Sequence, residues 1–383
     1  MSATILLDTN VEVIGDEDAL AEVIEPWRRL AESRGNAFVS PDWFLTARRC
    51  LDPTAEPAVA VVRSAAGEVR GVLPLLRTRA GRRSGLGFAG AAYADLVHPA
   101  ASEEEEAEVA ALAAPALAEH VGSRCRLDLG RVDAGSTWWR QLADAWPSSL
   151  TAIAGPPETL PYATIAGCSW EDYLAARSGQ FRNQVRRKGK ALERDHRVSL
   201  ESATTGAEVP ARMQTLFRLH DARWQDRRDE TALADPAARE FLSEFAAAAQ
   251  ARGWLRLYTL EADGEAVAAW CGWRLGDRFS YYQAGFDPGW SKYSVGFLML
   301  ARTVEAAIAE GSAEYDLLLG DEAFKARFAT GERHGHSAHL VAPFSAARLG
   351  AAGRARGRAL VRALPEPLRE RVRAGRRRIG GRG

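Results

Sequence analysis

The sequence is poor in the residues that cross-link chains or bind metals. It has four cysteines in 383 residues, and none of them forms a Cys-x-x-Cys pair. Their wide spacing gives neither a zinc motif nor a disulfide framework. We therefore expect no metal site, and a reducing compartment such as the cytoplasm fits best. The four cysteines are Cys50, Cys125, Cys168 and Cys271.

Long apolar runs and net charge are also missing. No apolar stretch approaches the roughly 20 residues of a transmembrane helix, and Asp8, Glu12 and Asp16 make the N-terminus unlike a signal peptide. Fifty basic residues balance fifty acidic ones, which excludes a wholly basic nucleic-acid-binding protein. Hydrophobic residues make up 46% of the chain, so a globular core is expected, in two domains or one large one.

The even charge balance conceals a basic C-terminal tail. Residues 344–383 contain twelve arginines, opposed only by Glu366 and Glu370. Such a tail is either a solubilising terminus or a contact with an acidic partner, namely a lipid surface or RNA.

The order of expected elements repeats along the chain. Each half has a hairpin around a glycine turn, a third strand that ends in glycine, a helix at apolar 3.6-residue spacing, and a short strand that ends in glycine. The offset between equivalent third strands is 195 residues, and between the short strands it is 190. The paired glycines are Gly67 and Gly264, Gly90 and Gly285, and Gly130 and Gly320. The repeat predicts an α/β (α+β) fold of duplicated modules, each with a mixed central sheet flanked by helices.

The boundary between the modules is expected in the Pro- and Gly-rich segment 155–162. We therefore divide the chain into residues 1–158, residues 159–343 and the tail 344–383. After the boundary, residues 169–196 predict one basic helix with Ser169 as its N-cap. Helices near 211–226 and 236–252 follow.

Residues that could take part in binding or catalysis gather in the second half. In the predicted strand 279–287, alternation places Tyr282 with Ala284 on one face and Tyr281 with Gln283 and Gly285 on the other. The glycine-containing loop after this strand leads into a helix near Phe297, and a helix N-terminus can bind phosphate or carboxylate.

Two more groups stand out in this half. His220 and Trp224 share a helix face at i and i+4, and Arg223 can stack on Trp224. Lys325 lies in a predicted helix after Gly320, near the carboxyl ends of the central strands, where ligands bind in open α/β sheets.

Residues from about 181 to 328 resemble the CelD/BcsL-type acetyltransferase domain of the GNAT superfamily, which is related to the Fem aminoacyl-tRNA-dependent peptidyltransferases. The order and spacing of several short motifs carry this resemblance. The motifs are Phe181–Arg187, His220–Trp224, Gly253–Tyr258, Tyr281–Asp287, Tyr293–Gly296, Tyr315–Gly320 and Phe324–Lys325. Weaker marks lie in the first half, at Ser40–Phe44, Leu73–Leu75 and Tyr93–Leu96.

The sequence departs from the family pattern at two places. The usual Ser-Pro-Gly is Ser294-Val295-Gly296, and the usual Tyr-Lys is Phe324-Lys325, which removes one phenol. The glycine and the lysine are both retained.

The resemblance implies two GNAT-like modules, of which the second carries the reaction. An acyl thioester would insert between the strand ending at Asp287 and the strand ending at Gly320, and an amine would attack it directly. Lys325 would stabilise the developing charge, His220 and Asp287 are candidate bases, and Tyr282 is a candidate acid for the leaving thiolate. The expected substrate contacts are Arg182, Arg223, Trp224, Gln283, Phe286 and Asp316, although Asp316 is an alternative organiser of its strand end. The expected contacts with the pyrophosphate are made by the backbone of Ser294, Val295, Gly296 and Phe297.

The implied reaction is transfer of an acyl group, acetyl first, from acetyl-CoA or another acyl-CoA to a small-molecule or sugar amine. Two alternatives remain open from the residues. An aminoacyl-tRNA donor is favoured by the basic segment 182–190 and by the tail. A non-catalytic accessory role in polysaccharide biosynthesis is favoured by the irregular phosphate loop.

Overall fold

The structure is a computed structural model, and it describes residues 10–80, 83–122, 125–225, 231–320 and 323–342. The predicted class, a mixed α/β fold with a large sheet flanked by helices, is confirmed. The basic tail lies outside the described residues. Among those that are described, no helix is both long and apolar enough to cross a membrane.

We call β1–β7 and their helices the N-terminal half. Its strands are β1 (Asn10–Ile14), β2 (Glu56–Arg63), β3 (Val69–Ala80), β4 (Arg83–Phe88), β5 (Ala100–Ala101), β6 (Arg126–Asp133) and β7 (Thr151–Ala154). Its helices are α1 (Ile24–Ser33), α2 (Pro41–Cys50), α3 (Glu106–Val121) and α4 (Trp138–Asp144), with 3₁₀ turns η1 (Asp18–Glu22) and η2 (Ala37–Val39).

The elements from β8 onward form the C-terminal half. Its strands are β8 (Glu158–Thr164), β9 (Val198–Ser202), β10 (Leu255–Ala262), β11 (Glu265–Leu275), β12 (Arg278–Phe286), β13 (Glu314–Asp316) and β14 (Gly331–Val341). Its helices are α5 (Trp170–Ala175), α6 (Gly179–Asp195), α7 (Val209–Arg223), α8 (Pro236–Ala251), α9 (Val295–Ala309) and α10 (Ala323–Phe328), with 3₁₀ turns η4 (Ala232–Ala234) and η5 (Pro288–Tyr293).

The strands of both halves join in one sheet. Its order is β1-β2-β3-β4-β6-β14-β8-β13-β12-β11-β10-β9, with β5 on β3 and β7 on β14. In each half one parallel pair, β4 with β6 and β12 with β13, interrupts otherwise antiparallel pairing. This equivalence matches the repeat seen in the sequence. The division into domains at residues 158 and 343 stays a prediction.

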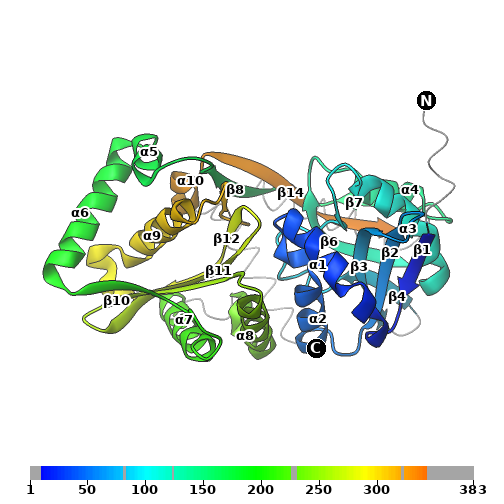
Figure 1. Cartoon of the computed structure of the whole chain (residues 1–383), viewed down its shortest axis with the longest axis horizontal. Helices are drawn as coiled ribbons and strands as arrows, with labels where there is room; N and C mark the ends of the chain where they lie inside the picture. The colour runs from blue at the N-terminus through cyan, green and yellow to red at the C-terminus, as the bar shows by residue number, and fades with distance from the viewer. Residues whose placement is uncertain (1–9, 81–82, 123–124, 226–230, 321–322, 343–383) are drawn as a thin grey trace, which may run out of the picture.

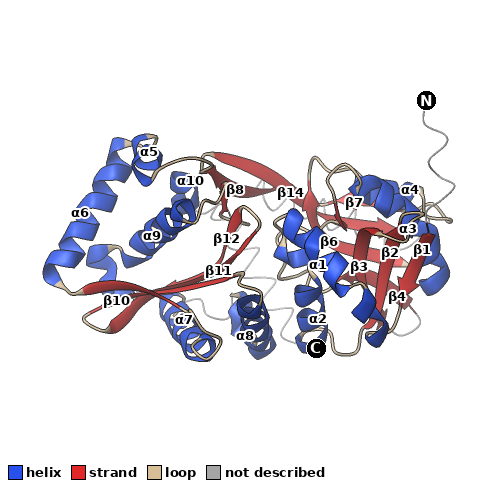
Figure 2. Ribbon diagram, in the orientation of Figure 1, coloured by secondary structure: helices blue, strands red, loops and turns tan. Residues whose placement is uncertain are grey.

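Strand β14 joins the two halves, and it was not expected from the sequence. Figure 2 shows it crossing from one half to the other. Its first residues pair with β8, and its later residues pair with β6 and β7. The last strand of the described part of the chain therefore completes the sheet of the N-terminal half.

Helices cover the C-terminal sheet on both sides. In Figure 1, α7 and α8 lie below β10–β12, and α9 and α10 lie above. Gly285 lets α7 approach β12 closely, because a Cβ at this position would lie 2.2 Å from the backbone N of His220. The predicted single helix over 169–196 is wrong: it is two helices, because the side chain of Ser178 accepts a hydrogen bond from the backbone N–H of Phe181 and starts α6 anew.

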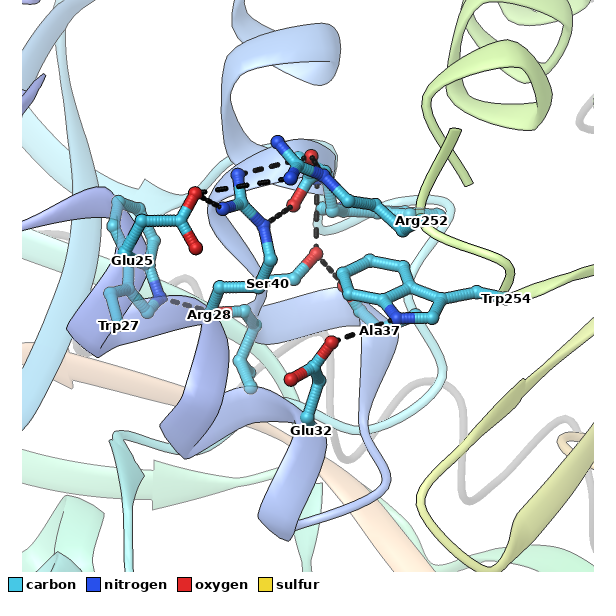
Figure 3. Close-up of polar contacts among 11 residues, drawn as sticks. Glu25, Trp27, Arg28, Glu32, Ala37, Ser40, Arg252 and Trp254 are labelled. Carbon is cyan, nitrogen blue, oxygen red and sulfur yellow. Dashed lines mark hydrogen bonds and ion pairs between the residues drawn. The ribbon is translucent and has the colours of Figure 1, made fainter. Parts of the chain in front are cut away.

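The two halves share a core and polar contacts. Trp43 of α2 packs edge-on against Phe241 and Phe245 of α8, with ring centroids 4.7 and 5.0 Å apart. The polar rim is shown in Figure 3, where the indole of Trp254 donates to Glu32 at 3.0 Å. Arg252 reaches Asp42 of α2 at 3.4 Å, next to the bond between Arg28 and the same carboxylate. This interface fixes the relative position of the halves.

Candidate active site

The neighbouring parallel strands β12 and β13 separate after a short pairing. Only residues 278–280 pair with residues 314–316, although β12 continues to Phe286. After β13 the chain turns at Leu318, whose φ of +55° is uncommon for a residue other than glycine. Backbone strain of this kind concentrates at functional sites. We call the point where the strands part the wedge.

Lys325 lies at the wedge and is only 4% exposed. Its ammonium donates a hydrogen bond to the carbonyl of Leu319, and it lies 5.4 Å from the ring centroid of Tyr281 on β12. The backbone N–H of Leu319 donates to Asp95 at 3.1 Å. The backbone of Leu319 therefore binds an ammonium from the C-terminal half through its carbonyl and a carboxylate from the N-terminal half through its N–H.

Asp95 was not among the predicted site residues. Burial raises its pKa to about 6, and the bond from Leu319 and the charges of Arg131 and Lys325 oppose this rise. The sequence carried a signal at Tyr93–Leu96, but nothing in it placed this motif beside residue 319, more than 200 residues later.

Asp316 is buried at the end of β13. It accepts from the backbone N–H of Leu318 at 2.9 Å and pairs with Arg333 at 3.4 Å. Burial raises its pKa, against the opposing charge of Arg333. These contacts favour the alternative that Asp316 organises the strand end.

Arg223 lies among three aromatic rings at the end of α7. Its guanidinium carbon is 5.0 Å from the Trp224 centroid, 5.3 Å from that of Phe286 and 5.9 Å from that of Phe324. It also donates to the carbonyl of Ala284 on β12 at 3.3 Å. The structure thus brings together three predicted substrate contacts, namely Arg223, Trp224 and Phe286, with the residue that precedes Lys325.

His220 is 4% exposed, and its Nδ1 has no hydrogen-bond partner among the described residues. Burial, with the nearby charge of Arg223, lowers the pKa of His220 to about 4. The imidazole is therefore uncharged at neutral pH, the state in which it can accept a proton.

The expected alternation along β12 is wrong at Tyr282, because a β-bulge lies there. Gly272 of β11 pairs with Tyr281 and Cys271 pairs with Gln283, so Tyr282 is the extra residue. Tyr282 packs against Phe38, Trp43 and Trp273 and donates to the carbonyl of Tyr93 at 3.0 Å. Burial raises its pKa well above the ordinary value.

The bulge therefore separates the predicted acid from the ammonium. Tyr282 packs with the core cluster that contains Trp43 and Trp273, whereas Tyr281 belongs to the cluster on the side of α9. Gln283, paired with Cys271, follows Tyr282 to the first of these faces. The ring centroid of Tyr281, in contrast, lies 5.4 Å from the ammonium of Lys325.

A tight turn precedes α9, at the residues for which the sequence predicts contacts with the pyrophosphate. Ser294 has a left-handed φ of +57°, and a Cβ on Gly296 would lie 2.6 Å from the ring of Phe286. The N–H of Phe297 donates to the carbonyl of Ser294, so it is used within the turn. The first N–H groups of a helix have no intrahelical acceptor, which leaves Val295 and Gly296 as the candidate donors.

Arg182 and Asp287 have local structural partners. Arg182 donates to the carbonyls of Ala175 and Arg177 at the end of α5. Asp287 accepts from the N–H of Gly289 at 2.8 Å and caps η5. Their predicted roles at the substrate stay predictions.

The residues that form this arrangement match a known family of domains. Residues 179–326 match the family model described as an acetyltransferase (GNAT) domain. The chain thus contains a GNAT acyltransferase domain, and acyltransferase is its enzyme class. No curated protein is significantly similar to the chain.

Solved structures with the same fold cover most of the chain. FemX superposes with a TM-score of 0.58, at 12% identity, over 81% of this chain and 95% of FemX. The C-terminal domain of a protein described as a lysylphosphatidylglycerol synthetase from Agrobacterium fabrum has a TM-score of 0.52, at 14% identity, over 86% of this chain and 94% of that domain. L-PGS from Bacillus licheniformis has a TM-score of 0.51, at 11% identity, over 90% of this chain and 97% of that protein. At these identities the likeness shows the fold alone. The finer resemblance to CelD/BcsL-type enzymes stays a prediction.

Proposed function

We propose that the protein is a cytoplasmic N-acyltransferase that moves an acyl group, acetyl first, from acyl-CoA to an amine. The observation that carries this proposal is the wedge between β12 and β13 with the buried ammonium of Lys325 beside it. A cation there would stabilise negative charge that develops on a thioester carbonyl oxygen.

The charge at the two helix starts supports the C-terminal half as the donor site. In the N-terminal half, Glu103–Glu106 precede or begin α3 and would repel a pyrophosphate. In the C-terminal half, Lys292 lies just before α9 and pairs with Asp195 at 3.4 Å, and Lys188 of α6 donates to the carbonyl of Lys292. Lys188 and a helix N-terminus form a suitable environment for phosphate groups.

In the proposed reaction the neutral amine attacks the thioester carbonyl carbon. A C–N bond forms, the C–S bond breaks, and the thiolate leaves as the proton lost by the amine passes to it. Two described groups are suited to transfer this proton. One is the uncharged imidazole of His220, whose Nδ1 has no hydrogen-bond partner among the described residues, and the other is Asp95, beside Lys325.

An aminoacyl-tRNA donor is the second candidate. It is favoured by the exposed face of α6, where Arg186, Arg187 and Lys190 form no ion pair with the described residues. Such a row of cations suits a phosphodiester backbone.

Thermal unfolding with each donor tests the proposal. Acetyl-CoA at 100 times its Kd should stabilise the protein by about 2.7 kcal/mol, whereas charged tRNA should give no shift. Lys325→Met should lower kcat at least about 100-fold and leave acetyl-CoA binding within tenfold, because methionine fills the same buried space. A shift with charged tRNA alone, or full activity of Lys325→Met, would contradict the proposal.

A further inference from the structure

A cavity of about 680 Å³ lies between the two halves, away from the start of α9. Phe38 and Trp138 of the N-terminal half and Trp273 of the C-terminal half line it. The rings of Phe38 and Trp273 meet edge-on at 5.7 Å. Cavities of several hundred Å³ at such boundaries are typical of small-molecule sites. We call it the interface cavity.

Each arginine that lines this cavity forms an ion pair with a protein carboxylate. The ion pairs are Arg34 with Glu106 at 3.4 Å, Arg278 with Glu314 at 3.1 Å, and Arg333 with Asp316 at 3.4 Å. Three lining carboxylates, in contrast, form no ion pair with any described residue: Glu103, Asp133 and Asp277. Among the described residues, the carboxylate of Asp133 accepts a hydrogen bond from the backbone N–H of Gly135, at 2.7 Å. The charge left over in the cavity is therefore negative, and a cationic ligand fits it.

The cavity also reaches the wedge. Ser280, which pairs with Asp316 at the last register position before β12 and β13 part, lines it. Ser280 is 3% exposed, and its hydroxyl makes no hydrogen bond to the described residues. Leu318 forms part of the same wall, and the carbonyl of the next residue binds Lys325. The wall of the cavity therefore includes the residue next to Leu319, at which the proposed reaction centre lies.

We propose that the interface cavity binds the acceptor, and that the acceptor is a small compound with at least two amino groups. This inference rests on the proposed function. Carboxylates hold an amine in its protonated form, which cannot attack a carbonyl. One ammonium must therefore anchor the acceptor at Glu103, Asp133 and Asp277, and a second amino group must reach the wedge and react.

The reacting amino group behaves as in the general reaction. It loses a proton, its nitrogen forms the amide bond to the acyl carbon, and the C–S bond of the donor breaks to give the thiol. The anchoring ammonium takes no part in bond exchange. The product keeps its positive charge at the carboxylates and loses it at the wedge.

Calorimetry on the full chain tests the site without turnover. The probes are 1,5-diaminopentane and spermidine, with 1-aminopentane as the matched monoamine. We expect the diamines to bind at least tenfold more tightly than the monoamine. The double variant Asp133→Asn/Asp277→Asn should remove at least tenfold of that affinity, whereas Asp144→Asn, an exposed change at the end of α4 outside the cavity lining, should not.

Equal binding of diamines and monoamine, no binding of any probe, or unchanged binding by the double variant would overturn the inference. An acetyl-CoA assay with the same amines separates it from the proposed function. If monoamines are acetylated as well as diamines in wild type and double variant, the cavity inference fails and the proposed function stands. If diamines bind through the cavity carboxylates but acetyl-CoA does not bind, the proposed function fails and the cavity remains a polyamine site.

Discussion

Burial acts on the two candidate proton-transfer residues, His220 and Asp95, in opposite directions. It lowers the pKa of His220 to about 4 and raises that of Asp95 to about 6, because removal from water disfavours the charged form of each. At pH 7 the imidazole is neutral and Asp95 is mostly ionised beside Lys325. The charges at the wedge are therefore an ammonium at the carbonyl of Leu319 and a carboxylate at the N–H of the same residue, whereas the imidazole on α7 carries no charge.

The depressed pKa of His220 predicts a pH-dependent stability. The unfolded chain binds a proton at His220 between pH 6.5 and about 4, and the folded chain does not. The stability that His220 contributes is complete above pH 6.5 and is lost as the pH falls through 4. We expect the free energy of unfolding of His220→Phe, measured in urea, to fall less than that of the wild type as the pH is lowered over this range. Parallel curves for the two proteins would show that His220 is not buried as described.

At the scale of a single strand, the bulge in β12 at Tyr282 most changes which site residues lie together. Residue patterns predicted β10, β11 and β12 and the helices α8 and α9, because apolar periodicity and turn residues are local signals. A bulge depends on which residues of β11 face β12, namely Gly272 against Tyr281. Strict alternation therefore grouped Tyr282 with Ala284 and Tyr281 with Gln283, whereas the bulge groups Tyr281 with Ala284. The sequence also assigned Tyr281 no role at the site.

The turn before α9 depends on one glycine. A Cβ on Gly296 would lie 2.6 Å from Cδ1 of Phe286, so Gly296→Ala must displace that ring or the start of α9. We expect a loss of about 1–3 kcal/mol in chemical denaturation and weaker acetyl-CoA binding.

Two further variants make this prediction specific. Phe286→Leu should recover part of the loss in the double variant, because the two sites are in contact. Gly189→Ala is the matched control in α6, where an added Cβ meets no atom within 4 Å, and it should gain up to about 1 kcal/mol. If Gly296→Ala were as stable as the wild type, that result would contradict the tight packing of α9 on β12.

At the scale of the whole molecule, long-range pairing is what the sequence did not reveal. The duplication and the order of elements were readable from glycine turns and helix periodicity. Strand β14 was not, because its sequence, with three histidines and two glycines, lacks a clean apolar alternation. Its partners β6 and β8 lie far away in the chain. For the same physical reason Asp95 could not be assigned to the site, since only the packed halves bring it to Leu319.

The position of β14 makes the two halves interdependent. A chain that ends at Thr330 would lack β14 and leave the edges of β6, β7 and β8 unpaired. We expect this truncated chain to show no cooperative unfolding, or a Tm lower by more than about 10 °C, in calorimetry. A chain that ends at Ala342 keeps every described strand and should unfold as the full chain does. If the chain ending at Thr330 kept a sharp, native-like transition, the halves would be independent folding units, and the contact between Asp95 and Leu319 would be a consequence of docking rather than of a shared sheet.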